Sequence, residues 1–288
     1  VINDAPLAID PATIGGQNWE PKNFDGSYSG PISMRNALTK SKNLVSIRIL
    51  MAITPQYAQE YVTRFGFDPK SHPPYLTMAL GAGSVTPLQI AGGYSIFANG
   101  GFRVTPYFID RIEDGKGQVL ARTEPEMVGK NAQQVIDPRN AFIMTSIMGD
   151  VVRRGTAAKA AILGRHDLAG KTGTTNDQFD AWFAGFQRTV VAVAWMGYDQ
   201  PRSLGGSETG GQAALPIWIS YMGKALKNVP EYQPTVPEGV VVQSHDSGNG
   251  MTNEYYYQEY TQTNPELRLE QGSQNNGQVQ DEVKDMLF

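Results

Sequence analysis

The sequence predicts an α+β fold in which an antiparallel sheet is flanked by helices, with an additional helical subdomain. Helical and strand patterns mix irregularly along the chain, which disfavours the regular βα alternation of a parallel sheet. Apolar residues recur at helical spacing around residues 32–65, 86–99 and 137–155. Two segments have the pattern of apolar strands, residues 181–186 and residues 190–198, and only three residues separate them.

The helical elements are predicted from proline and cap residues. Pro31 suits the first turn of a helix that begins at residue 32. Ser41-Lys42-Asn43 interrupts this helix with residues that favour helix ends. Two later helices start at a cap residue followed by proline, at Thr86 and at Asp137.

The strands are predicted from β-forming residues and turn signals. Residues 102–122 form a hairpin pattern with a turn at 114–117, and residues 168–175 are expected to be extended. Residues 190–195 are apolar throughout, so we expect that strand to be buried on both faces. The large aromatic residues of this region are predicted to be mostly core, with one of them available for a cleft wall: Trp182, Phe183, Phe186 and Trp195.

Charge and composition divide the chain of 288 residues in two. Residues 231–288 contain ten acidic and two basic residues, net −8, whereas the first 230 carry the other 18 acidic and 22 basic residues, net +4. We expect one folded domain over residues 1–230 and an acidic, partly disordered tail over 231–288, with little structure beyond Val242. A net charge of +4 on a body of this size does not indicate nucleic-acid binding.

Composition also narrows the chemistry. The chain has no cysteine, which excludes disulfides and thiol catalysis. Its three histidines, His72, His166 and His245, are scattered without the spacing of a metal site, so we expect no metal. No apolar run approaches the ~18 residues of a membrane span. The chain starts at Val1 within a polar loop, as a piece of a longer protein would.

Gly170-Lys171-Thr172 superficially matches the end of a phosphate-binding loop. That motif requires a further glycine at position 165, where this chain has Arg165, and a helix directly after the threonine. The residues that follow, Gly173 to Asn176, are poor helix formers. Nucleotide binding is therefore disfavoured.

A strand that lines a cleft explains the same stretch better. Lys171 supplies a positive charge, and Thr172 and Thr174 place their hydroxyl groups on one side of a strand. Gly173 between them lets a ligand approach the backbone, and an edge strand can pair with an extended peptide. This combination suits a peptide that ends in a carboxylate. The alternative is an ordinary strand with a surface lysine.

Ser41-Lys42-Asn43 has two interpretations. Taken alone, it is a helix break of the kind that serine and asparagine commonly form. Together with Lys171-Thr172-Gly173, it gives two of the three motifs that characterise penicillin-binding proteins and class A β-lactamases, the first being Ser-x-x-Lys.

The chain resembles the C-terminal transpeptidase domain of class A, bifunctional penicillin-binding proteins of the penicillin-binding protein 1A type. Longer sequence segments carry this resemblance, and they occur in the family's order over roughly residues 1–230. They are Asn3 to Pro6, Trp19 to Asn23, Ala37 to Asn43, Leu80 to Gln89, Phe97 to Gly101, Arg154 to Ala157, Ala169 to Asn176, Ala181 to Phe186, and Ala213 to Trp218.

The resemblance implies the penicillin-binding protein/serine β-lactamase-like fold and peptidoglycan D,D-transpeptidase chemistry without a cofactor. A serine attacks the D-Ala–D-Ala end of a stem peptide, and an amine of a second stem resolves the acyl-enzyme. β-Lactams acylate the same serine. By resemblance, Ser41 relays a proton, Asn43 binds a substrate amide, and Lys171 orients Ser41. The hydroxyl groups of Thr172 and Thr174 hold the carboxylate, and the Thr174 N–H is one oxyanion donor.

The chain departs from the family in one respect, because none of its serines has lysine three places later. We therefore expect the nucleophile in a segment of the same protein upstream of Val1. The resemblance also implies a membrane anchor and a glycosyltransferase domain there, and thus a location at the periplasmic face of the bacterial inner membrane.

Two other functions stay open at this point. The first is a β-lactamase or β-lactam sensor of the same fold, although no obvious glutamate-bearing loop would activate the deacylating water. The second is a catalytically inert binding or scaffold piece, with the acidic tail as its contact surface.

Overall fold

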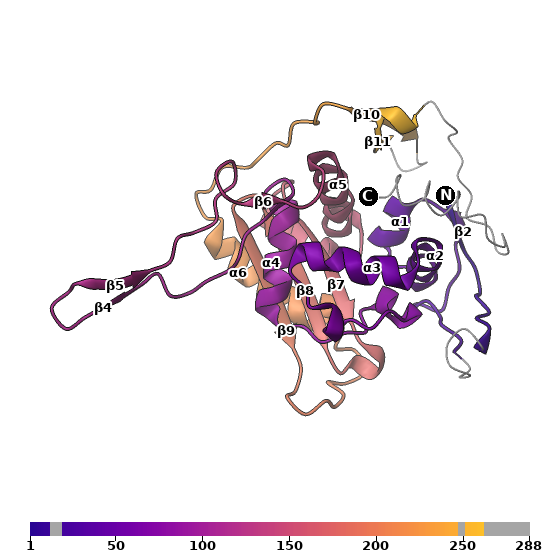
Figure 1. Cartoon of the computed structure of the whole chain (residues 1–288). Coiled ribbons are helices and arrows are strands. Elements are labelled where there is room, and N and C mark those ends of the chain that lie inside the picture. The colour runs from indigo at the N-terminus through magenta and orange to yellow at the C-terminus, as the bar shows by residue number, and fades with distance from the viewer. Residues whose placement is uncertain (12–18, 247–250, 262–288) are drawn as a thin grey trace.

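The computed structural model describes residues 1–11, 19–246 and 251–261 (Figure 1). It confirms the α+β architecture with an antiparallel sheet. The central strand of this sheet is β8 (Ala181–Gln187), which pairs with β7 (Ala169–Thr174) on one side and with β9 (Val190–Met196) on the other. β7 is thus an edge strand of the three-stranded sheet.

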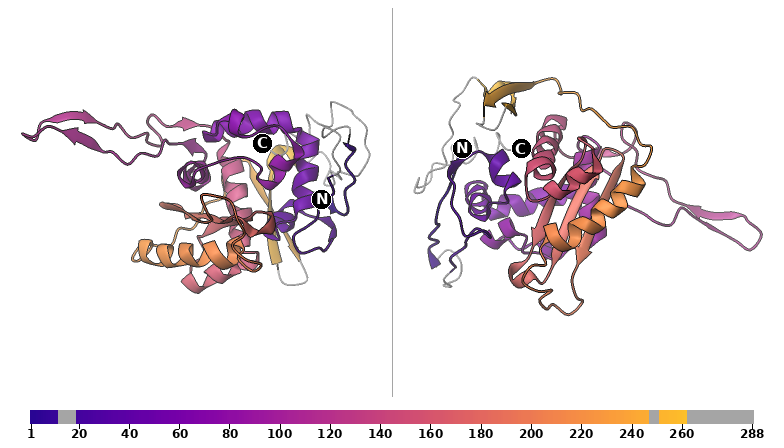
Figure 2. Two further views of the ribbon diagram at one scale, coloured as in Figure 1. Left: turned by 90° about the horizontal axis from the view of Figure 1, so that it is seen from below. Right: turned by 180° about the vertical axis from the view of Figure 1, so that it is seen from behind.

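Helices cover both faces of this sheet. α6 (Leu215–Ala225) crosses one face, as the view from behind shows (Figure 2). α4 (Pro87–Ala98) and α5 (Pro138–Arg154) pack on the other. Aromatic contacts join the layers, because Phe183 of β8 meets Trp218 of α6 with ring centroids 4.9 Å apart.

The helical subdomain is built from the first part of the chain. It contains α1 (Met34–Thr39), α2 (Asn43–Ile53) and α3 (Pro55–Val62). Four two-stranded sheets complete the described chain: β1 (Ile2–Asp4) with β2 (Gly30–Ile32), β3 (Phe102–Arg103) with β6 (Gln133–Gln134), β4 (Arg111–Glu113) with β5 (Val119–Arg122), and β10 (Val240–Asp246) with β11 (Met251–Tyr257). In the described part of the chain, no helix has the length and apolar character needed to cross a membrane.

The start of α1 differs from the prediction. Pro31 lies in β2, opposite Asn3, and the helix begins two residues after the predicted position. Ser33 is its N-cap, since the Ser33 hydroxyl oxygen accepts a hydrogen bond of 3.2 Å from the Asn36 N–H. Proline is compatible with this place because a two-stranded sheet consists of edge strands.

Two strand predictions were also wrong in part. The hairpin pattern predicted over residues 102–122 is a hairpin only from Arg111 to Arg122, because Phe102 and Arg103 pair with β6 instead. β9 is not buried on both faces, and Trp195 within it is 37% exposed. The exposed residues, Trp195 and Met196, lie at the end of the strand, whereas Ala194 before them is buried.

The segment beyond Val242, predicted to have little structure, contributes to an ordered hairpin. β10 and β11 pair over seven residues each, and Tyr255 of β11 stacks edge-on against Phe142 of α5 with centroids 5.1 Å apart. The packing of polar, tyrosine-rich strands is hard to predict from the sequence, because their apolar contacts come from aromatic rings rather than from runs of aliphatic residues. Residues 262–288 lie outside the described residues, and the division at residue 230 remains a prediction.

A buried lysine fixes the turn between α1 and α2. The Lys42 side chain is 3% exposed, and its ammonium lies 2.9 Å from Asp25 Oδ2 and 3.6 Å from Asp4 Oδ2. It also donates to the hydroxyl of Ser27 at 2.9 Å. Burial alone would raise the pKa of Asp25, but hydrogen bonds from Lys42 and Ser27 lower it to about 2. Lys42 thus joins the N-terminal strand, the 23–27 loop and the helical turn.

We expect Lys42→Met to destabilise the fold strongly. Removing one partner of a buried ion pair leaves the other charge uncompensated, which typically costs about 3–5 kcal/mol. Urea unfolding, followed by circular dichroism, measures this free energy. Lys40→Met, at an exposed position two residues earlier, is the matched control and should change it by less than about 0.5 kcal/mol. Equal effects of the two substitutions would contradict the structural role of Lys42.

Candidate active site

Ser41 occupies a strained position at the end of α1. The Ser41 N–H donates to the Leu38 carbonyl at 3.0 Å, and the Lys42 N–H donates to the Ala37 carbonyl at 2.9 Å. These two bonds form a Schellman motif, in which the residue after the cap is usually glycine because it is left-handed. Ser41 takes that place with φ +55°. A non-glycine residue here costs about 1 kcal/mol or more, and such strain is characteristic of functional positions.

Lys171 of β7 reaches this turn from the sheet. Its Nζ donates a hydrogen bond of 2.7 Å to Ser41 Oγ and one of 2.9 Å to the Thr172 carbonyl. The two residues are 130 positions apart in sequence. Burial lowers the pKa of Lys171 to about 8. The ammonium is therefore mostly protonated at neutral pH, but it loses its proton more readily than a surface lysine does.

The pairing of β7 with β8 sets the directions of its side chains. Gly173 lies opposite Trp182, and Thr172 lies opposite Phe183. Since side chains alternate along a strand, Lys171 and Gly173 share the Trp182 face, whereas Thr172 and Thr174 share the other. The two threonine hydroxyl groups are thus on one side, as predicted. At Gly173 an added Cβ would lie 3.2 Å from the Trp182 Cβ, so a side chain there would crowd the strand.

Each threonine hydroxyl has a partner that orients it. Thr172 Oγ1 lies 2.6 Å from Thr156 Oγ1, and either atom can donate. Thr174 Oγ1 accepts a 3.0 Å hydrogen bond from the Gly210 N–H. The Thr174 proton is thus available to an acceptor such as a carboxylate, and the Thr172–Thr156 pair retains one more donor proton.

Asn43 does not converge on the same point. It is the first residue of α2, and its Nδ2 donates to the Lys22 carbonyl at 2.9 Å. The neighbouring Asn23 accepts a hydrogen bond from the Leu44 N–H at 3.2 Å. Asn43 is thereby tied to the 19–23 segment. Its predicted contact with a substrate amide remains a prediction.

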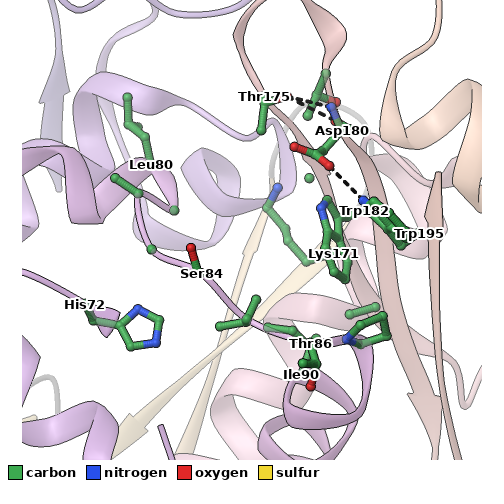
Figure 3. A pocket seen from close by; sticks show the side chains of 18 of the residues that line it. His72, Leu80, Ser84, Thr86, Ile90, Lys171, Thr175, Asp180, Trp182 and Trp195 are labelled. Carbon is green, nitrogen blue, oxygen red and sulfur yellow. Dashed lines mark hydrogen bonds between the residues drawn. The ribbon is translucent and has the colours of Figure 1, made fainter. Parts of the chain in front are cut away.

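A cavity of about 840 Å³ lies along β7, between the sheet and the helical subdomain. Figure 3 shows Lys171 between Leu80 and Ser84 on one side and Trp182 and Trp195 on the other. Residues 171–175 of the β7 segment all line it, but Ser41 and Asn43 do not.

Two of the predicted core aromatics belong to the wall of this cavity. Trp182 and Trp195 stack with centroids 5.9 Å apart, and Trp195 Nε1 donates to Asp180 Oδ1 at 2.8 Å. Phe183 and Phe186 are buried, as predicted. Across residues 1–11, 19–246 and 251–261, no group of three or more acidic or histidine residues could hold a metal ion.

Sequence reasoning missed Thr156 and Gly210 as residues of the site. Thr156 follows the last turn of α5 and bonds Thr172, and Gly210 packs directly on β7. A Cβ at Gly210 would lie 2.4 Å from the Gly173 carbonyl oxygen. Thr156 lies within the family-like segment 154–157, whereas Gly210 lies before the segment 213–218, and neither segment contains the spacing that would have linked these residues to β7.

Comparisons with known proteins test the family resemblance. The family described as penicillin-binding protein transpeptidase domain matches residues 1–218. Penicillin-binding protein 1A of Neisseria lactamica is 53% identical over 272 residues, which cover 94% of this chain and 33% of the relative. The protein of the same name from Pseudomonas aeruginosa is 41% identical over 84% of this chain and 35% of the relative. The chain thus spans about a third of the length of these relatives.

Solved structures give the same result. Penicillin-binding protein 1A of Haemophilus influenzae superposes with a TM-score of 0.82 and 32% identity, covering 88% of this chain and 44% of that one. The penicillin-binding protein PonA1 of Mycobacterium tuberculosis gives a TM-score of 0.66 with 25% identity over 82% of this chain and 66% of its own. The match over residues 1–218, together with these relatives, shows that the chain belongs to the family of penicillin-binding protein transpeptidase domains.

Proposed function

We propose that this chain forms one wall of a serine D,D-transpeptidase site that cross-links peptidoglycan stem peptides and is acylated by β-lactams. The observation that carries the proposal is the 2.7 Å contact between Lys171 Nζ and Ser41 Oγ. It joins the second and third motifs of the family in space although they are far apart in sequence. A structure of PonA1 in complex with penicillin V has the same fold, with a TM-score of 0.65, and supports the β-lactam part of the proposal.

In the first half of the reaction, a serine oxygen attacks the carbonyl carbon of the D-Ala–D-Ala bond. The C–N bond breaks, and the leaving nitrogen takes up a proton and departs as D-alanine. Lys171 donates to Ser41 Oγ, so the hydroxyl proton of Ser41 points elsewhere and is available for the leaving nitrogen. The lysine charge also favours loss of that proton. Ser41 then regains a proton from the attacking serine.

The edge of β7 binds the peptide. An extended peptide adds to the open edge of a strand through main-chain hydrogen bonds. The available hydroxyl protons at Thr172 and Thr174 suit the terminal carboxylate, and Lys171 adds a positive charge nearby. The Thr174 N–H serves as one oxyanion donor, and the loss of such a donor typically costs ~10²–10³ in rate. Asn43 contributes a substrate contact once the peptide lies along the strand.

In the second half, an amine of a neighbouring stem attacks the acyl-enzyme. The new C–N bond forms the cross-link, and the bond to the serine oxygen breaks, with return of the amine proton to that oxygen. We further propose that this serine lies in a Ser-x-x-Lys segment of the same protein, outside this chain. A glycosyltransferase domain and a membrane anchor elsewhere in that protein would place the site at the periplasmic face of the inner membrane.

The first prediction concerns the chain by itself. We expect that it forms no covalent adduct with penicillin, because it contains no Ser-x-x-Lys sequence. Intact-mass spectrometry after incubation measures this directly. The complete protein serves as the positive control and should gain the mass of one penicillin molecule. An adduct on this chain alone would contradict the proposed origin of the nucleophile.

The second prediction separates the hydroxyl of Ser41 from its backbone conformation. In the complete protein, Ser41→Gly should lower the rate of penicillin acylation by ~10²–10³, in the range of a lost proton-transfer group. Ser41→Gly and Ser41→Ala both lose the hydrogen bond from Lys171, but the free energy of unfolding should be about 1 kcal/mol higher for Ser41→Gly than for Ser41→Ala, since glycine accepts the left-handed conformation.

Ser41→Ala is the matched control for this experiment. It also removes the hydroxyl but keeps the backbone strain, so it should lose the same acylation rate and should be the less stable of the two variants. Near-normal acylation by Ser41→Gly, with loss only in Ser41→Ala, would show that Ser41 has a conformational role alone.

The third prediction concerns pH. Lys171 has a folded-state pKa of about 8, below its usual value of 10.5, so its charge is present below pH 8 and is lost as the pH rises through 8. Stopped-flow acylation by penicillin should therefore fall above about pH 8. In Lys171→Arg, where the guanidinium stays protonated, any residual acylation should lack this alkaline limb. The same limb in both proteins would exclude Lys171 as the titrating group.

A further inference from the structure

The C-terminal hairpin β10–β11 is joined to the helix that carries the Ser41 turn. The family match ends at residue 218, so this hairpin lies beyond the matched region. In Figure 1 it lies next to α5, on the side where α1 begins. The link is a salt bridge of 2.8 Å between Arg35 Nε of α1 and Glu254 Oε2 of β11.

Arg35 is the point at which three elements meet. Its side chain is 2% exposed. The NH1 nitrogen donates to Asp150 Oδ2 and to Ser146 Oγ of α5, at 3.2 Å each. Its guanidinium also lies over the ring of Tyr255, 5.7 Å from the centroid. Arg35 therefore joins α1 to α5 and to the hairpin at once.

Glu254 is needed to neutralise the positive charge of Arg35, because the other carboxylate beside Arg35 is shared. Asp150 already accepts from Arg153 at 2.6 Å and from Arg154 at 2.9 Å, in addition to Arg35. Burial alone would raise the pKa of Asp150, but Arg153 and Arg154 hold it below its usual range. One carboxylate thus serves three guanidinium groups, and Glu254 is the second anion. Without it, the buried Arg35 would have only the shared Asp150 carboxylate as a counter-charge, which is costly in a site of low dielectric.

The position of Arg35 bears directly on Ser41. α1 has only six residues, which is too short for a helix to be stable without tertiary contacts. Its orientation therefore depends on what holds it. At its far end, the Thr39 carbonyl accepts from the Thr156 N–H at 3.3 Å. The two Schellman bonds then couple Ser41 rigidly to the last turn, so a shift of α1 moves the Ser41 hydroxyl relative to Lys171.

We propose that Glu254, acting through Arg35, positions the Ser41 hydroxyl against Lys171, so that the C-terminal hairpin is a working part of the transpeptidase site. Glu254 is a positioning residue, since it contacts neither Ser41 nor the cavity. The inference rests on the proposed function, because it assigns a role within that site. A displacement of about 1 Å at a reacting group can cost ~10²-fold in rate.

The test is Glu254→Gln in the complete protein. Glutamine keeps the shape of the side chain but lacks its charge. The acylation rate constant for penicillin should fall by about 10- to 100-fold, while the dissociation constant of the noncovalent complex stays within about twofold of the original. Thermal unfolding confirms that the variant is folded. If Glu254→Gln does not fold, Glu254→Asp replaces it and is judged by the same criteria.

The matched control is Glu259→Gln. Glu259 lies two residues after the end of β11 and also bonds an arginine, with 2.8 Å between its Oε1 and Arg139 NH1, but Arg139 lies on α5 and not on α1. This variant should acylate at the original rate. Equal loss in Glu254→Gln and Glu259→Gln, or no loss in either, would overturn the proposal.

A double variant tests whether the effect passes through Ser41. Once Ser41→Gly has removed the hydroxyl, Glu254→Gln should slow acylation no further. If the two losses multiply instead, Glu254 acts through general stability and the proposal is wrong. Failure of the proposed function itself looks different, because then Ser41→Gly alone would leave acylation unchanged.

Discussion

The geometry of the site depends on one hydrogen bond between two segments that lie far apart in the sequence. Lys171 Nζ and Ser41 Oγ lie 2.7 Å apart, and they bring the edge of the sheet to the turn between α1 and α2. Each partner is held from its own side. β7 is fixed by its pairing with β8, and the Ser41 turn is fixed by the buried Lys42 and by the Schellman bonds of α1. The contact therefore needs both scaffolds to be correct at the same time.

The three residues of the Ser41-Lys42-Asn43 turn make different contacts and have different roles. Ser41 points towards Lys171 and accepts its hydrogen bond. Lys42 points into the fold and neutralises Asp4 and Asp25. Asn43 starts the next helix and binds the Lys22 carbonyl. Lys42 and Lys171 thus have opposite roles. Lys42 is a structural cation with full compensation, whereas the charge of Lys171 is only weakly favoured, as its pKa of about 8 indicates.

The sequence allowed prediction of the helices that begin at cap residues and of the strands around Lys171, because these signals are local. The Thr86 cap is an example, since its hydroxyl accepts from the Gln89 N–H and Gln89 binds back to the Thr86 N–H. The prediction failed where the outcome depended on distant pairing. Pro31 entered a strand because Asn3 lies opposite it, and Trp195 stayed partly exposed because it lines the cavity.

The residues of the candidate site also divide into those that local sequence patterns predict and those that depend on packing between elements. Ser41 and Lys171 were identified from short motifs and a family resemblance, and their residue types already suggested a charge and a hydroxyl. The partners of the threonines, Thr156 and Gly210, and the link from Arg35 to Glu254 come from packing between elements. No local pattern encodes a contact across 219 positions, such as the Arg35–Glu254 bridge. For the same reason, the tyrosine-rich C-terminal segment was predicted to have little structure, although it packs on α5.

The most direct measurement is a crystal structure of the complete protein after acylation by penicillin. We expect that the Lys171 ammonium still contacts the Ser41 hydroxyl and that the penicillin carboxylate is bound by the hydroxyl groups of Thr172 and Thr174 at the edge of β7. A carboxylate bound elsewhere, with Lys171 turned away from Ser41, would contradict the proposed roles of these residues.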